Sequence, residues 1–298
     1  MENYTVWRGE KVIPSKFDYA RAESVEHAIQ LMQETNGEGK YLAGGHSLLP
    51  LMKFRVTEPK KLIDITRIPN LKDVRVEHDR LYVGALLTHR EVAEHPLIQE
   101  HIPVLSDTAR VVADIQIRNR GTIGGNIAHG DSIADLPAPA LALDANIMIT
   151  DENGSDVVNI DGFFLGPLIT ALSENSIITG FSFEIPPKHA KSTYLKYFHP
   201  ATGYPVVGVA AIVGVDKNNA VDYLRVAITG AADTPYRAYS VEEELIGKPL
   251  TEEHIENAAK LAANDGDIGN DMFASEEYRT NLCQVYTKRA IQKIAKEL

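Results

Sequence analysis

Apolar positions along the first third of the chain have first a helical and then a strand-like spacing. Apolar residues recur every three or four positions over residues 22–35, which predicts an amphipathic helix that Asn36 and Gly37 should end. Short apolar strands are predicted at residues 40–43 and 61–65, and the pair Gly44-Gly45 directly follows the first of them. Helix, strand, glycine turn and strand together predict a small α/β unit.

The middle of the chain alternates between hairpin and helix patterns. Period-two alternation around His78 predicts a hairpin, and Asn153-Gly154 marks the turn of a second one. Thr88 is the expected cap of a helix, and Pro137 falls in the first turn of another. The predicted strands are residues 74–76, 81–83, 146–150 and 156–160, and the predicted helices are residues 88–93, 103–114 and 136–143.

The pattern changes after Gly166-Pro167, where β-rich runs come first and helices follow. The runs are residues 177–185, 193–198, 206–215 and 221–229, and the helices are residues 238–246, 252–264 and 275–296. This change predicts a domain boundary near residues 170–176. We therefore expect an N-terminal domain over residues 1–175, with subdomains at about 1–58 and 59–175, and a C-terminal α+β domain over residues 176–298.

Composition narrows the classes of function. The 298 residues are 44% hydrophobic and 24% charged, which is typical of a globular protein, and no run of about 18 apolar residues predicts a membrane span. The start, residues 1–4, lacks the features of a signal peptide, so a cytoplasmic location is expected. The formal charge of −11 argues against a nucleic-acid partner. The single cysteine, Cys283, excludes an internal disulfide and a cluster held by four cysteines of this chain, and it is expected to be a buried thiol.

Two glycine segments carry the candidate chemistry. In residues 43–50 the glycine pair precedes a short apolar helix, so successive backbone amides can bind an anion, and Ser47 adds a hydroxyl donor. Residues 118–126 are interpreted as a second loop of this kind. Both lack the Walker lysine pattern and G-x-G-x-x-G. Two such loops indicate a long ligand with two polar ends, such as a dinucleotide. Asp135 can accept from a ribose hydroxyl or cap the helix that starts at Leu136.

The motifs together resemble a known family. Residues 43–53 read A-G-G-H-S-L-L-P-L-M-K, residues 117–127 read I-R-N-R-G-T-I-G-G-N-I, and residues 134–137 read A-D-L-P. In this order they resemble the medium, flavin-binding subunit of the aerobic carbon monoxide dehydrogenase and xanthine dehydrogenase family, over essentially the whole chain. The resemblance implies an α+β fold, which is the two-subdomain FAD-binding fold of the vanillyl-alcohol oxidase (PCMH) type followed by a C-terminal α+β domain.

The resemblance also implies a site and a role. FAD is expected to be bound noncovalently, the first glycine loop wraps its diphosphate, and the second contacts the diphosphate and the flavin side. Tyr204 is expected to cover the isoalloxazine ring, unless it is an ordinary hairpin tyrosine. No catalytic residue is expected. The implied cofactor-binding residues are Ala43, Gly44, Gly45, His46, Ser47, Leu48, Thr88, Thr122, Ile123, Gly124, Gly125, Asn126, Asp135, Ile178, Lys196 and Tyr204.

The implied partners are a large subunit with the molybdenum cofactor and a small subunit with two [2Fe–2S] clusters, assembled as a dimer of heterotrimers. Electrons pass from the clusters through FAD to an external acceptor. Three alternatives remain at this point. His46 can attach the flavin covalently, as in berberine-bridge-type oxidases. The chain can be a stand-alone reductase similar to the one that reduces UDP-N-acetylenolpyruvylglucosamine. It can also be a flavin-free scaffold between the other subunits.

Overall fold

The computed structural model describes residues 13–298, and its first sheet has three parallel strands. The middle strand is β3 (Lys61–Asp64), between β1 (Asp18–Arg21) and β2 (Gly39–Leu42). Helix α1 (Val25–Gln33) packs on this sheet, and α2 (Leu48–Lys53) follows the first glycine pair. Strand β1 was not predicted, because three of its four residues are exposed and leave no apolar alternation to detect.

The predicted subdomain boundary at residues 58–59 is wrong, because it separates β3 from the two strands that flank it. Ile63 in β3, for example, pairs with Ala20 in β1 on one side and with Tyr41 in β2 on the other. The first subdomain therefore extends through β3. The predicted domain begins at residue 1, but residues 1–12 lie outside the described residues. They include residues 1–4, on which the prediction of a cytoplasmic location depends.

The second sheet has five antiparallel strands in the order β4-β5-β10-β6-β7. They are β4 (Val74–Glu77), β5 (Arg80–Gly84), β10 (Ile177–Glu184), β6 (Asn146–Asp151) and β7 (Gly154–Asn159). Between β5 and β6 the chain forms α3 (His89–Glu94), α4 (Pro96–His101), α5 (Pro103–Val111), α6 (Ile115–Arg118), α7 (Ile123–His129) and α8 (Pro137–Ala142). Two short strands, β8 (Phe164–Gly166) and β9 (Ile169–Thr170), pair with each other. The predicted helix over residues 103–114 ends earlier, since Ala113 has a φ of 38°.

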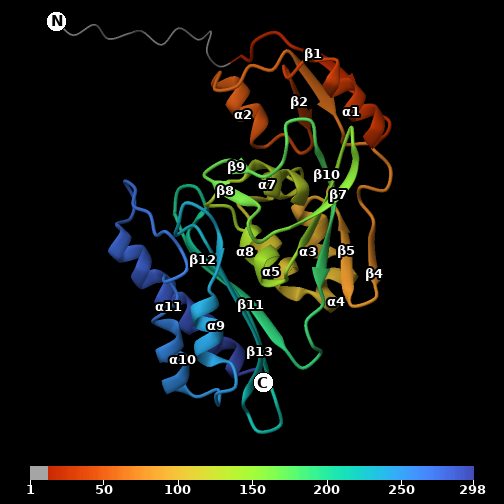
Figure 1. Cartoon of the computed structure of the whole chain (residues 1–298). Helices are drawn as coiled ribbons and strands as arrows, with labels where there is room; N and C mark the ends of the chain where they lie inside the picture. Colours follow the sequence, from red (N-terminus) through yellow and green to blue (C-terminus); the bar gives the residue numbers. More distant parts are fainter. Residues whose placement is uncertain (1–12) are drawn as a thin grey trace, which may run out of the picture.

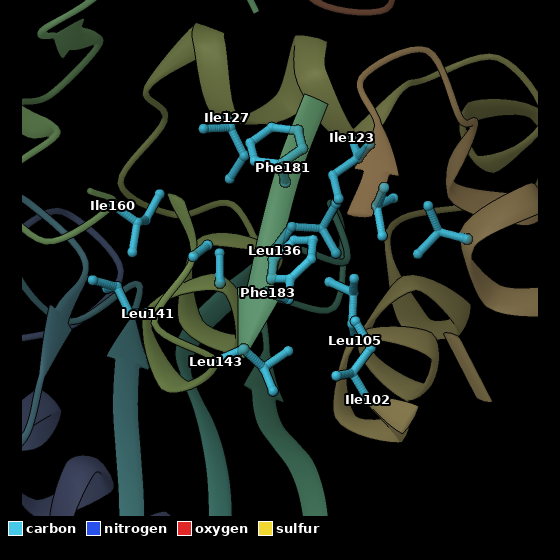
Figure 2. Close-up of a cluster of buried hydrophobic side chains, with 14 of the residues drawn as sticks. Ile102, Leu105, Ile123, Ile127, Leu136, Leu141, Leu143, Ile160, Phe181 and Phe183 are labelled. Carbon is cyan, nitrogen blue, oxygen red and sulfur yellow. The ribbon is translucent and has the colours of Figure 1, made fainter. Parts of the chain in front are cut away.

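Strand β10 supplies the centre of the largest apolar core. Phe181 and Phe183 are two residues apart in β10 and therefore lie on the same face of the strand, with their ring centroids 5.8 Å apart. Figure 2 shows Ile123 and Ile127 of α7 at one end of this pair and Leu105 of α5 beside it. Because β10 pairs with β5 on one side and β6 on the other, it belongs to the N-terminal domain, and the predicted boundary at residues 175–176 is one strand too early.

The C-terminal domain is a four-stranded antiparallel sheet with helices on one face. Its strands are β11 (Lys191–Phe198), β12 (Pro205–Val215), β13 (Val221–Thr229) and β14 (Tyr236–Arg237), and its helices are α9 (Tyr239–Leu245), α10 (Glu252–Ala259) and α11 (Glu276–Ala295). Figure 1 shows these blue helices on one side of the sheet and α5 and α8 on the other. The α+β class is thus confirmed.

Strand β12 is buried on both faces, which explains its almost uninterrupted apolar sequence. Val207, Val209 and Val213 belong to the core shared with the C-terminal helices, whereas Ala210 and Ile212 belong to the core shared with the N-terminal domain. A strand covered on both sides carries apolar residues at every position instead of at alternate ones. None of the helices in the described part of the chain combines the length and apolar character needed to cross a bilayer.

Candidate functional site

A cavity of about 670 Å³ lies where the two subdomains and the C-terminal domain meet. This is within the usual size of a cofactor or substrate site. Thirteen predicted site residues line it, which are Ala43, Gly44, Gly45, His46, Ser47, Leu48, Thr122, Gly124, Gly125, Asn126, Asp135, Ile178 and Tyr204. Thr88, Ile123 and Lys196 are not among the residues that line it. The structure therefore brings together most residues of the predicted site.

The first glycine segment supplies a row of free backbone amides to this cavity. Within residues 13–298, the amides of residues 44–48 donate to no protein acceptor. Gly45 has a φ of +76°, a conformation that lets consecutive amides converge on one point. Ser47 begins α2 without a side-chain capping bond, so its hydroxyl is also free to bind a ligand. An anion held here would need no lysine.

The second glycine segment differs from the prediction. It forms the first turn of α7, and the amides of residues 123–126 already donate hydrogen bonds within the protein. Thr122 caps the helix by accepting from the Gly125 amide at 3.1 Å. The other amides donate to backbone oxygens, Ile123 to Leu87, Gly124 to Ala85 and Asn126 to Thr122. The amides of residues 123–126 are therefore not free to bind an anion as the prediction assumed, although Thr122, Gly124, Gly125 and Asn126 do line the cavity. Gly124 serves packing instead, since a Cβ there would lie 2.7 Å from the carbonyl oxygen of Ala85.

Asn126 is a polar residue of α7 that lines the cavity. Its Oδ1 is enclosed and has no hydrogen-bond partner among the described residues. Enclosed polar atoms are rarely left unpaired in a folded protein. An amide that can both donate and accept therefore fits a polar ligand in this cavity, whereas an apolar ligand would leave it unpaired.

Asp135 does not cap α8, so that interpretation is wrong. The N-cap is Leu136, and the Asp135 carboxylate instead accepts from the Tyr194 hydroxyl at 2.7 Å and from the Lys196 ammonium at 3.0 Å. Burial raises the pKa of the Asp135 carboxyl, and Lys196 and Tyr194 oppose this effect. Asp135 is also among the residues that line the cavity, although its side chain is only 3% exposed.

Lys196 holds the turn that carries Tyr204. Its ammonium donates to the carbonyl oxygens of Val111 and Gly203, both at 2.8 Å, in addition to Asp135. Tyr204 follows Gly203 at the cavity wall with 40% of its surface exposed. Burial raises the pKa of its hydroxyl, with smaller contributions from Asp131 and Asp135. Lys196 thus positions a cavity residue without itself lining the cavity.

His89 was missed by the sequence analysis, although it lines the cavity. It is the first residue of α3 and is only 3% exposed, and its Nδ1 has no partner among the described residues. Burial lowers the pKa of its imidazole to about 4, and His46 and Arg118 add to this effect. In the sequence it is one of ten histidines, next to a helix cap, so no local signal distinguishes it.

Comparisons with known proteins agree with the corrected domain boundary. A family model described as the FAD binding domain in molybdopterin dehydrogenase matches residues 15–188, and one described as the CO dehydrogenase flavoprotein C-terminal domain matches residues 194–294. The carbon monoxide dehydrogenase medium chain of Hydrogenophaga pseudoflava is 36% identical over 94% of this chain and 97% of that one. The xanthine dehydrogenase FAD-binding subunit of Escherichia coli O157:H7 is 32% identical over 93% of this chain and 96% of that one.

The same likeness holds in three dimensions. The solved structure of carbon monoxide dehydrogenase from Hydrogenophaga pseudoflava, in a form that lacks the Mo-pyranopterin moiety of the molybdenum cofactor, contains a chain that superposes with a TM-score of 0.91. It is 36% identical to this chain, and the match covers 95% of this chain and 99% of that one.

Proposed function

The chain belongs to the family of FAD-binding subunits of molybdopterin dehydrogenases. We propose that its cavity binds FAD noncovalently and that this FAD is one of the redox centres through which electrons pass. The observation that carries this proposal is the row of unpaired amides at residues 44–48, which suits a diphosphate. When bound, the flavin supplies the two-electron chemistry, and the protein supplies binding, orientation and electrostatics.

The remaining predicted residues divide into those that reach the cofactor and those that support them. Asp135 offers a carboxylate to a ribose hydroxyl, Asn126 offers its amide, and Ile178 and Tyr204 offer apolar surface to the rings. Thr88, Ile123 and Lys196 do not line the cavity and act as supports. His46 lines the cavity as a noncovalent contact in this proposal.

The partners that we propose are a large molybdenum-cofactor subunit and a small [2Fe–2S] subunit, in a dimer of heterotrimers located in the cytoplasm. The single cysteine supports this division, because clusters held by cysteine thiolates must then be on another chain. The task of this subunit is to collect electrons from a cluster and deliver them to an external acceptor.

Purification of the native complex tests these points together. We expect a yellow complex with three kinds of chain, and acid precipitation should release FAD into the supernatant. Flavin that stays with the precipitate would establish a covalent link through a residue such as His46. Turnover of an NADPH-dependent reaction by the isolated chain would contradict the subunit role and favour the stand-alone reductase. A colourless, folded chain within the complex would favour the scaffold.

Replacing Thr88 with alanine separates a capping role from direct cofactor binding. Thr88 and Glu91 form a reciprocal capping box, with the Thr88 amide donating to the Glu91 carboxylate at 2.8 Å. We expect Thr88→Ala to lower the free energy of unfolding by about 1 kcal/mol. FAD affinity, measured by fluorescence titration of the apoprotein, should stay within about twofold, because Thr88 is not among the residues that line the cavity.

The matched control is Thr251→Ala, which removes the equivalent cap of α10 in the C-terminal domain. Both variants should lose similar stability and keep the flavin. A tenfold loss of FAD affinity in Thr88→Ala alone would show that Thr88 contacts the cofactor.

A further inference from the structure

His89 is a buried residue of the cavity wall whose ring nitrogens have no hydrogen-bond partner within residues 13–298. Its backbone amide donates to the carbonyl oxygen of Gly121 at 2.9 Å, which fixes the start of α3 against the segment before α7. A Cβ at Gly121 would lie 2.8 Å from the Nε2 of His89, so the ring packs against Gly121 at a distance that leaves no room for a side chain. The imidazole is thus held in one position by its surroundings, while its ring nitrogens make no hydrogen bond to the described residues.

The two ring nitrogens differ, and this difference determines where the proton of the neutral ring lies. Nδ1 is enclosed and has no acceptor in the described part of the chain, so a proton there would be a buried donor without a partner. The tautomer with the proton on Nε2 leaves an unpaired acceptor at Nδ1, but it places the single N–H of the ring on the nitrogen that is not enclosed and can reach a ligand. A second proton could only be added at the enclosed Nδ1. The ring therefore stays neutral and presents a single N–H donor from Nε2.

This donor lies on the side of the first glycine segment. Gly121, against which Nε2 lies, also packs on Gly44, where an added Cβ would be 2.8 Å from the Cα of Gly121. Gly44 begins the row of unpaired amides, and His89, Gly121 and Gly44 all line the cavity. His46, which lies within that row, also interacts electrostatically with His89, so an anion at those amides would lie near the imidazole.

We propose that the Nε2–H of neutral His89 donates a hydrogen bond to the FAD diphosphate, which makes His89 a cofactor-binding residue beside the amides of residues 44–48. This inference rests on the proposed function, since it needs FAD in the cavity. The charged and titratable groups that face the ring are His46 from the β2–α2 loop and Arg118 from α6, and both disfavour a second positive charge. The low pKa of His89, about 4, agrees with a neutral donor near pH 7.

Substitution of His89 tests the donor directly in the apoprotein titrated with FAD. His89→Phe keeps a ring but removes the donor, and we expect it to weaken FAD binding by about 10- to 100-fold, the effect of one hydrogen bond to a charged acceptor. His89→Gln places an amide N–H near the position of Nε2 and should recover most of the affinity. The ³¹P resonances of bound FAD should shift in the phenylalanine variant and return toward their wild-type positions in the glutamine variant.

The control is His95→Phe. His95 also has an enclosed, unpartnered Nδ1 next to a helix start, but it does not line the cavity, so its replacement should change neither the affinity nor the ³¹P spectrum. The ratio of dissociation constants between His89→Phe and wild type should be constant from about pH 6 to pH 8. A ratio that falls as the pH rises would mean a charged imidazole and would overturn the neutral donor.

The outcomes also separate this inference from the proposed function. If wild-type protein takes up FAD and both His89 variants match it in affinity and ³¹P shifts, the inference is wrong and the proposed function stands. If folded wild-type protein binds no FAD, the proposed function itself is wrong. The His89→Gln variant keeps the inference testable if His89→Phe does not fold.

Discussion

Alanine at Gly44 is expected to remove stable FAD binding, which is the largest effect that we predict for a single methyl group. The added Cβ would overlap the carbonyl oxygen of Arg120 and lie 2.8 Å from the Cα of Gly121. Both are backbone atoms, so no side-chain rotation relieves the contact. The β2–α2 loop must therefore move away from the start of α7, and the amides of residues 44–48 move with it. We expect at least a 100-fold loss of FAD affinity, together with about 1–3 kcal/mol of stability.

Flavin absorbance per chain and the unfolding midpoint of the apoprotein measure the two effects. Gly269→Ala is the matched control, because a Cβ at that C-terminal position meets the nearest atom, an Asp233 oxygen, at an ordinary 3.7 Å. It should retain full flavin content. If Gly44→Ala also retained full flavin content, the close contact between the two glycine segments would not be needed for the site.

Methionine at Lys196 is expected to cost about 3–5 kcal/mol of stability, because it removes one partner of a buried ion pair. The side chains of Lys196 and Asp135 are only 10% and 3% exposed, so the remaining carboxylate cannot be compensated by water. The carbonyl oxygens of Val111 and Gly203 lose their donor as well. The turn before Tyr204 should then loosen, and we expect weaker FAD binding alongside the lower unfolding midpoint.

The stability loss of this variant should depend on pH in a known direction. Burial already raises the pKa of the Asp135 carboxyl in the folded protein, and removing the ammonium raises it further. A carboxyl whose pKa is higher in the folded state stabilises that state at low pH, and this contribution is lost as the pH rises through the folded pKa. Lys196→Met should therefore be closer to wild type near pH 5 than near pH 8, in urea titrations at both values.

Two further variants test whether the stability loss comes from the buried ion pair. One removes an exposed ion pair, and the other removes the buried charge that Lys196→Met leaves behind. Arg90→Met removes one partner of an exposed ion pair with Glu94, where the side chains are 59% and 63% exposed, and it should cost less than about 0.5 kcal/mol. In the Lys196→Met background, Asp135→Asn removes the uncompensated charge while still accepting from Tyr194, so it should recover part of the lost stability. A double variant less stable than Lys196→Met alone would contradict the ion-pair explanation.

The sequence predicted those features that depend on residues near one another along the chain. Strand β13 was predicted with its observed ends, and β12 within one residue of its start, because long β-branched runs end at turn residues. Thr88 was predicted as a cap, since capping needs only a hydroxyl at the right offset from the helix. The turn at Gly44-Gly45 could be predicted for the same reason, because positive φ and successive amides are local properties.

The second glycine segment and the domain boundaries depend on the tertiary structure. Whether the amides of Ile123 and Gly124 are free depends on the carbonyl oxygens of Leu87 and Ala85, about 40 residues earlier in the chain. Strand β10 belongs to the N-terminal sheet because β5 and β6 flank it, although its sequence resembles the strands that follow.

What the sequence determined by itself was the family, the cofactor class and the loop that suits a diphosphate, because these rest on contiguous motifs and on backbone conformations that particular residues allow. What only the tertiary structure decided was which groups remain unpaired around the cavity. Lys196 supports the turn before Tyr204 by a hydrogen bond to Gly203, and His89 is a buried imidazole whose Nδ1 has no hydrogen-bond partner within residues 13–298. Hydrogen-bond pairing and burial are properties of segments that meet only on folding, so no local pattern encodes them.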